Sequence, residues 1–337
     1  MGSQKKWSPG NIGILGSGSW ATALAKLLLS NHENINWYFR FRETVREFMA
    51  DGHNPRYLSS VTFDTEKITF FTDVPKLVAQ SDTLLLVTPS PYVKNILTKL
   101  KPSMLEGKFI LNAVKGIVPE DNILITDYLA KNLNVPEEMM GVIGGPCHAE
   151  EVALERCSYL TLGCSHHLKA EALTKSFETP FVQCTTSTDV PGIEYASVLK
   201  NVYAIAAGIC QGIRYGDNFQ AVLLSNAIKE MQRFLDRVNP QERQINDSVY
   251  LGDLLVTAYS RYSRNRTLGT MIGKGYSVKQ AQLEMEMVAE GYYGTNCIHQ
   301  VNKKYAVPMP IAETIYQILY HRLEPKSAIR KLSYQLT

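Results

Sequence analysis

The sequence predicts an α/β domain built on a doubly wound parallel sheet, followed by an all-α domain. In the first half of the chain, short apolar runs typical of strands alternate with helical patterns, which is the order of a parallel sheet with crossover helices. Beyond about residue 193, long segments with apolar residues at helical spacing follow one another with few strand signals. A chain of 337 residues is too long for one ordinary core and suits two domains.

The first domain is expected to contain six strands. They are predicted at 12–15, 35–39, 67–70, 83–87, 109–113 and 140–143, with helices at 21–31, 44–51, 74–80 and 93–100. The run 83–87 is apolar without alternation, as expected for a strand that helices cover on both faces. Pro89 and Pro91 end this strand at its carboxyl edge, where open α/β sheets bind their ligands.

The second domain is expected to be entirely helical. Its helices are predicted at 194–213, 219–238, 253–262, 278–289 and 310–323. The breaker cluster Asp-Val-Pro-Gly at 189–192 precedes the first of these helices. We therefore predict one domain over 1–192 and a second over 193–337.

Composition and charge exclude several classes of protein. The chain is 45% hydrophobic and 20% charged, with a formal net charge of only +3 and scattered Lys and Arg, so no electrostatic footprint for nucleic acid is expected. No apolar run reaches the ~18 residues of a membrane span, and residues 1–6 enter the first strand without a signal-peptide core. A cytoplasmic protein is expected.

The six cysteines are irregularly spaced, which favours free thiols over a zinc site. Cys164 lies close in sequence to His166 and His167, but this short cluster lacks the ligand set of a closed metal site. We expect no bound metal.

A glycine-rich turn follows the first strand, in the sequence Gly-Ile-Leu-Gly-Ser-Gly-Ser-Trp-Ala at 13–21. Gly16 permits a tight strand-to-helix turn, Gly18 lets the backbone approach a phosphate, and the amides of the following helix point at negative charge. Ser19 and Trp20 complete the turn. Its position after a strand and before a helix predicts a Rossmann-type dinucleotide site.

The residue after the second strand discriminates between the two nicotinamide dinucleotides. A carboxylate there binds the free ribose 2′-hydroxyl of NAD, whereas arginine favours the 2′-phosphate of NADP. This chain has Arg40 and Arg42 before its first carboxylate, Glu43. The competing interpretation is that both arginines are solvated loop residues. We expect NADP or NAD as the cofactor, with NADP favoured.

Four further segments carry polar residues in apolar surroundings. They read Val-Lys-Gly-Ile at 114–117, Gly-Gly-Pro-Cys-His-Ala-Glu at 144–150, Leu-Lys-Asn-Val at 199–202, and Gly-Asp-Leu-Leu-Val-Thr at 252–257 followed by Ser-Arg-Asn-Arg at 263–266. Together with the glycine turn, they resemble, in order and over nearly the whole chain, the NAD(P)-dependent glycerol-3-phosphate dehydrogenases of bacterial type. Each element is weak alone, but the set is highly specific.

Lys200 is the central catalytic candidate. It lies in an apolar, alanine-rich helical segment with no acidic residue at helical spacing, where burial would lower its pKa from the free-solution value of about 10.4 towards neutrality. Without further context, a lysine that reaches water from the edge of a buried helix is the simpler reading. The resemblance implies that Lys200 exchanges the proton as general acid and base.

The resemblance also implies partners for this lysine. Asp253 would orient the ammonium and moderate its pKa, although an aspartate there also suits a helix N-cap. Lys115 would place a second positive charge beside the substrate. Otherwise it is an ordinary loop lysine.

Further site residues follow from the resemblance. The segment Ser263-Arg264-Asn265 is the best phosphate candidate, because a guanidinium gives paired hydrogen bonds to phosphate oxygens and its neighbours add neutral donors. The competing interpretation is a solvated basic patch. The implied substrate contacts are Lys115, Gly145, Cys147, Lys200, Asn201, Asp253, Thr257, Ser263, Arg264 and Asn265. The implied cofactor contacts are Gly16, Gly18, Ser19, Trp20, Arg40, Lys115, Ala149, Arg264, Val288 and Glu290. Cys147 departs from the family, which usually has Ser or Thr there, and a thiol is the poorer donor.

The resemblance predicts reversible hydride transfer between NAD(P)H and dihydroxyacetone phosphate, giving sn-glycerol 3-phosphate for phospholipid synthesis. A homodimer is expected by analogy with the family. One alternative is another two-domain hydroxyacid dehydrogenase, although its glycine-serine loop and lysine context differ from 199–209. The other is a dinucleotide-sensing protein without turnover.

Overall fold

The computed structural model describes residues 7–285 and 287–337, and it divides into two compact units. The sheet unit comprises the described residues up to Thr88 together with Tyr92–Val114 and Ile125–Val190. The helical unit comprises Pro89–Pro91, Lys115–Leu124 and Pro191–Thr337. The expectation about residues 1–6 lies outside the described residues.

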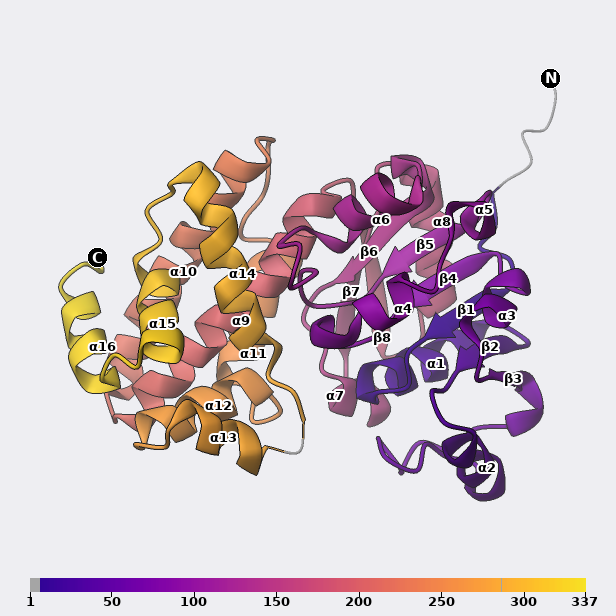
Figure 1. Cartoon of the computed structure of the whole chain (residues 1–337), viewed down its shortest axis with the longest axis horizontal. Coiled ribbons are helices and arrows are strands. Elements are labelled where there is room, and N and C mark those ends of the chain that lie inside the picture. Colours follow the sequence, from indigo (N-terminus) through magenta and orange to yellow (C-terminus); the bar gives the residue numbers. More distant parts are fainter. Residues whose placement is uncertain (1–6, 286) are drawn as a thin grey trace. The chain divides into compact units, whose positions relative to one another are not determined.

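The sheet unit is built on an eight-stranded sheet with the order β3-β2-β1-β4-β5-β6-β7-β8 (Figure 1). The strands are β1 (Ile12–Leu15), β2 (Ile35–Tyr38), β3 (Ile68–Phe71), β4 (Thr83–Leu86), β5 (Phe109–Asn112), β6 (Met140–Gly144), β7 (Ser158–Gly163) and β8 (Val182–Ser187). All neighbours pair in parallel except β6 and β7, which are antiparallel. The reversal of order at β1 and β4 makes the sheet doubly wound.

The predicted fold class is confirmed, with two corrections to the sheet. All six predicted strands form, and their ends lie within one residue of the prediction. The prediction missed β7 and β8, because β8 is a polar edge strand (Val-Gln-Cys-Thr-Thr-Ser) and β7 carries no long apolar run. The antiparallel pairing of β7 was therefore not foreseen, although such additions are common at one side of a parallel sheet.

The helices of the sheet unit connect successive strands. They are α1 (Ser19–Asn31), α2 (Arg42–Asp51), α3 (Val74–Ala79), α4 (Lys94–Leu97), α5 (Pro102–Leu105), α6 (Ile125–Leu133), α7 (Ala149–Ala153) and α8 (His167–Phe177), with short 3₁₀ turns at Thr65–Lys67 and Glu137–Met139. A further 3₁₀ turn, Ser90–Tyr92, begins in the helical unit. The predicted helix at 93–100 is only the single turn α4.

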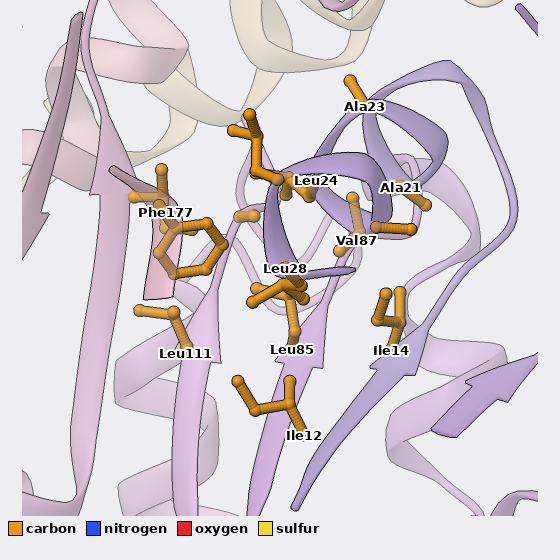
Figure 2. Packing of buried hydrophobic residues seen from close by; sticks show 14 of the residues in the cluster. Ile12, Ile14, Ala21, Ala23, Leu24, Leu28, Leu85, Val87, Leu111 and Phe177 are labelled. Atoms are coloured by element: carbon orange, nitrogen blue, oxygen red, sulfur yellow. The ribbon is translucent and has the colours of Figure 1, made fainter. Parts of the chain in front are cut away.

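The core of this unit lies between the sheet and α1. Figure 2 shows Leu24 and Leu28 of α1 above Ile12 and Ile14 of β1 and Leu85 of β4. These side chains are at most 3% exposed, and each fully buried aliphatic side chain contributes about 1.5–3 kcal/mol. The start of α1, where the glycine turn lies, is therefore held against the carboxyl end of β1.

The helical unit contains the remaining helices. They are α9 (Val190–Gly212), α10 (Gly216–Val238), α11 (Asp253–Tyr259), α12 (Arg264–Gly273), α13 (Val278–Glu284), α14 (Glu290–Tyr305), α15 (Pro310–His321) and α16 (Pro325–Ser333), and a π-helical turn, Ser248–Gly252, precedes α11. No helix of the described residues is both long enough and apolar enough to cross a bilayer.

The five predicted helices of this unit all form, but some bounds were wrong. The helix predicted at 278–289 ends at Glu284, since Met285 is extended, and the helix predicted at 253–262 ends at Tyr259. The prediction also missed α12, α14 and α16. Internal glycines interrupt the apolar pattern of α12 and α14, and α16 spans only Pro325–Ser333.

Two helices of this unit, α9 and α12, are in backbone contact. A Cβ on Gly208 of α9 would overlap the carbonyl of Arg266, and a Cβ on Gly269 of α12 would overlap that of Ile205. Only glycine allows two helices this close. The contact fixes the position of α12, which begins at Arg264, relative to α9, which carries Lys200.

We predict that Gly208→Ala lowers the free energy of unfolding by about 1–3 kcal/mol, because the added methyl group must push the helices apart. Urea denaturation of the variant and the wild type measures this difference. Gly18→Ala is the matched control, because a Cβ on Gly18 meets nothing within 4 Å and its φ of −79° suits alanine. Equal destabilisation by the two substitutions would contradict the close helix contact.

Candidate active site

The glycine turn has the geometry of an anion cradle. Gly16 adopts a φ of +146°, and a Cβ there would overlap the Val87 carbonyl, so the chain can pass β4 only with glycine at this position. Gly18 is the N-cap of α1 and has no side-chain cap, and the first turn contains no acidic residue. The 13-residue helix therefore begins with open space beside Gly18 and with no competing carboxylate in its first turn.

The other cofactor candidates of the sheet unit lie at strand ends. Ser19 is buried and Trp20 half-buried in the first turn of α1. Arg40 is exposed two residues after β2, with its guanidinium 5.1 Å from the Phe41 ring centroid. Arg42 opens α2. Both arginines thus lie in the segment where a dinucleotide site meets the adenosine ribose.

The loop after β6 carries Gly145, Cys147 and Ala149. Gly145 adopts a φ of +109°, and a Cβ there would lie 2.6 Å from the Tyr159 carbonyl oxygen. The Cys147 thiol donates to the Gly145 carbonyl across 3.2 Å, and Ala149 opens α7. The thiol therefore braces the loop itself, a role that the sequence did not indicate.

In the helical unit, Lys200 forms a buried ion pair with Asp253. The two side chains are each 3% exposed, and Nζ of Lys200 contacts Oδ2 of Asp253. Lys200 does not reach water, so the simple reading of a solvated lysine is wrong. Asp253 is the first residue of α11, and the N-cap is Gly252, so its carboxylate is directed to the lysine and does not cap the helix.

A chain of side-chain amides connects the segments around this pair. Asn201 donates to the Lys115 carbonyl (3.3 Å), and Asn265 donates to Oδ1 of Asn201 (2.9 Å). Oδ1 of Asn265 in turn accepts from the Gly291 amide (2.8 Å). Both asparagines are buried.

Most of the predicted site residues of the helical unit lie in or directly beside this series of hydrogen bonds. Lys200, Arg264 and Glu290 are the immediate neighbours of Asn201, Asn265 and Gly291, and Lys115 itself supplies the terminal carbonyl. The backbone positions of Lys200 and Arg264 are thus fixed by the side-chain amides of their sequence neighbours, Asn201 and Asn265.

Two hydroxyl candidates are engaged by their own helices. The Thr257 hydroxyl donates to the Asp253 carbonyl across 2.6 Å, and Ser263 caps α12 by accepting from the Arg266 amide. Arg264, which follows that cap, is half-buried. The hydroxyls therefore fix the helix starts beside Asp253 and Arg264.

Glu290, the first residue of α14, is half-buried, but its carboxyl oxygen Oε2 is enclosed by protein, and Lys115 and Arg264 place positive charge near it. Burial raises its pKa to about 7, and hydrogen bonds from Ser90 and the charges of Lys115 and Arg264 partly oppose this shift. Val288, two residues earlier, is half-buried. Sequence reasoning missed Ser90, although the proline-flanked segment at the end of β4 was a usable signal.

Comparison with known proteins identifies the family. A family model described as NAD-dependent glycerol-3-phosphate dehydrogenase N-terminus matches residues 11–170, and the model of the C-terminus of the same family matches residues 189–330. The chain belongs to the NAD-dependent glycerol-3-phosphate dehydrogenase family. The resemblance seen in the sequence is thereby confirmed.

Relatives of this dehydrogenase family cover nearly the whole chain. The chain is 32% identical to the glycerol-3-phosphate dehydrogenase [NAD(P)+] of Lysinibacillus sphaericus over 96% of both chains. It matches the crystal structure of the glycerol-3-phosphate dehydrogenase of Coxiella burnetii at 29% identity with a TM-score of 0.90, over 96% of this chain and 98% of that one. The Saccharomyces cerevisiae enzyme, at 21% identity, shares the fold with a TM-score of 0.82, over 96% and 99%.

The sheet unit fits the NAD(P) cofactor of the glycerol-3-phosphate dehydrogenase family. Gly16 can be only glycine, the space at Gly18 is open, and no carboxylate stands in the first turn of α1. These features suit the pyrophosphate that NAD and NADP share.

We predict that Glu290→Gln flattens the dependence of stability on pH between about 4.5 and 7. A carboxyl group whose folded pKa is raised binds its proton more tightly in the folded state, so the free energy of unfolding falls as pH rises through this window. The glutamine variant loses this contribution. Urea denaturation at several pH values measures the slope.

Ser90→Ala provides the companion variant. Hydrogen bonds from Ser90 lower the pKa of Glu290, so removing the hydroxyl extends the decline in stability to higher pH. The same pH slope in both variants and in the wild type would contradict the assignment of an enclosed, titrating carboxyl group to Glu290.

Proposed function

We propose that the protein is an NAD(P)-dependent sn-glycerol-3-phosphate dehydrogenase that transfers hydride reversibly between NAD(P)H and dihydroxyacetone phosphate. One observation carries the proposal: a chain of this family holds a lysine and an aspartate as an ion pair with side chains only 3% exposed. A buried ion pair is weak evidence for stability, because apolar residues of similar size often stabilise as well. Its presence therefore favours catalysis over passive dinucleotide sensing.

The proton is the part of the reaction that the chain supplies. When bound, NAD(P)H provides the hydride for C2 of dihydroxyacetone phosphate. Lys200 donates a proton from Nζ to the C2 oxygen, which becomes the hydroxyl of glycerol 3-phosphate, and takes it back in the oxidation. Asp253 holds Nζ in place and stabilises its charged form.

The substrate phosphate is assigned to the start of α12. Arg264 offers a planar guanidinium for paired hydrogen bonds, and Ser263 and Asn265 flank it. Lys115 adds positive charge, while Asn201 and Thr257 order the segments around the lysine. Gly145 and Cys147 are assigned to substrate, and Ala149, Val288 and Glu290 to the cofactor, on the resemblance.

The remaining assignments extend this proposal. Arg40 favours NADP over NAD. The dinucleotide-binding domain is assigned to 1–192 and the substrate-binding and catalytic domain to 193–337. A homodimer, a cytoplasmic location and a role in supplying phospholipid synthesis rest on the resemblance to the family.

We predict that Lys200→Ala and Asp253→Ala each lower kcat with NADPH and dihydroxyacetone phosphate by about 10²–10⁴-fold, the contribution of a positioned acid-base group. NADPH oxidation followed by absorbance measures the rate. No oxidation by the wild type would overturn the proposed function.

The double variant Lys200→Ala/Asp253→Ala separates chemistry from folding. Each single variant leaves one buried charge unpaired and is expected to lose about 3–5 kcal/mol of stability, whereas the double variant removes both charges and regains much of this loss. Its activity stays low. Recovery of turnover together with stability would exclude an acid-base role for Lys200.

We predict that Arg40→Asp weakens NADPH binding far more than NADH binding, since the carboxylate repels the 2′-phosphate and accepts from the free hydroxyl. Titration calorimetry with both cofactors measures the two affinities. Equal losses for NADH and NADPH in Arg40→Asp would remove the NADP preference.

A further inference from the structure

Three consecutive carbonyls of the glycine turn, those of Gly16, Ser17 and Gly18, are each held by a side chain of the sheet unit. Thr22 binds the third, because both its amide and its hydroxyl donate to the Gly18 carbonyl across 3.0 Å. Thr22 belongs to the helix that the turn begins, so this contact is local. The other two carbonyls are bound by residues from distant parts of the sequence.

Trp37 of β2 binds the first carbonyl. Its Nε1 donates to the Gly16 oxygen across 2.7 Å. The side chain is fully buried, and its ring packs against the rings of Phe39, Phe48 and Phe63 with centroids 5.0–5.7 Å apart. The donor is therefore fixed by a rigid aromatic cluster.

Asn54, in the segment after α2, binds the second carbonyl. Its Nδ2 donates to the Ser17 oxygen (3.0 Å) and to the Thr22 hydroxyl (2.8 Å), and its Oδ1 accepts from the Arg56 amide (3.1 Å). The residue is 1% exposed. A polar side chain so deeply buried, with both ends of its amide bonded, has one fixed orientation.

We propose that Trp37 and Asn54 are positioning residues for the dinucleotide, which hold the glycine turn in its pyrophosphate-binding form before the cofactor arrives. This inference rests on the cofactor of the proposed function. The geometry of the peptide group gives the reason. In a trans peptide the N–H points opposite to the C=O, so fixing the carbonyls of Gly16 and Ser17 also fixes the amides of Ser17 and Gly18.

Preorganisation of this kind determines affinity. A glycine turn without these anchors samples many conformations, and binding would then have to order it. With the carbonyls anchored on the inner side, the turn can present its amides to phosphate at no further cost in conformational entropy. The turn would contact the pyrophosphate, which NAD and NADP share, so the gain in affinity is expected to be the same for both cofactors.

The test measures cofactor affinity by titration calorimetry, independently of turnover. Asn54→Ala and Trp37→Phe each remove the donor to one carbonyl and are expected to weaken NADH, NADPH and ADP-ribose by about tenfold, the effect of one unmade buried hydrogen bond. The isosteric Asn54→Asp, which replaces the Nδ2 donor with an acceptor oxygen facing the Ser17 carbonyl, is expected to weaken them further. At saturating cofactor, kcat and the KM for dihydroxyacetone phosphate stay at the wild-type values.

A matched control separates positioning from folding. Asn36, one residue before Trp37, also donates to a backbone carbonyl, that of Gln80, so Asn36→Ala removes the same kind of bond away from the turn. This control is expected to lower Tm and leave the cofactor Kd within about twofold of the wild type.

Two results would decide against the inference. Unchanged cofactor affinity in a folded Asn54→Ala protein overturns it, and so does an equal loss of affinity in the Asn36→Ala control. Failure of the proposed function is recognised separately. Wild-type protein that binds the dinucleotides but does not reduce dihydroxyacetone phosphate removes the function and leaves the positioning role standing.

Discussion

The burial of the Lys200 ammonium is the constraint on which the helical unit depends. Burying an unpaired charge among the apolar side chains around α9 would cost several kcal/mol of folding free energy. Another element must therefore supply a carboxylate that pairs with Lys200. Asp253 supplies it from the first residue of α11. The π-helical turn Ser248–Gly252 immediately before it sets the point at which α11 begins, and such turns recur at functional sites.

The remaining contacts fix the positions of the segments that carry this pair and the neighbouring charged residues Lys115 and Arg264. The backbone contact at Gly208 and Gly269 fixes α12 beside α9, and the bonds of Asn201 and Asn265 then join these helices to the Lys115 segment and to the start of α14. An amide can donate and accept at once without changing charge. It therefore orders charged neighbours without altering the electrostatics of the site.

The sequence predicted the fold class and most elements, because buried strands and amphipathic helices have distinct periods. It missed β8 and α14, whose polar residues and glycines hide these periods, and it placed the end of α13 five residues too late. For the site, the resemblance named the residues, but no local pattern could pair Lys200 with Asp253, 53 positions away. Ser90 was missed for the same reason: its partner Glu290 is distant in the sequence. Such pairings are set by tertiary packing.

In both units, neutral side chains donate hydrogen bonds to the backbone carbonyls of the candidate site segments. In the sheet unit, buried donors on Trp37 and Asn54 bind the carbonyls of the glycine turn, and in the helical unit the amide of Asn201 binds the Lys115 carbonyl. In each case the donor to the backbone oxygen is a neutral side chain. A charged donor in the same place would change the local electrostatic potential. Because these donors are neutral, they order the backbone without adding a charge that would compete with the ion pair of Lys200 and Asp253. The residues that order the backbone are thus different from those that carry charge.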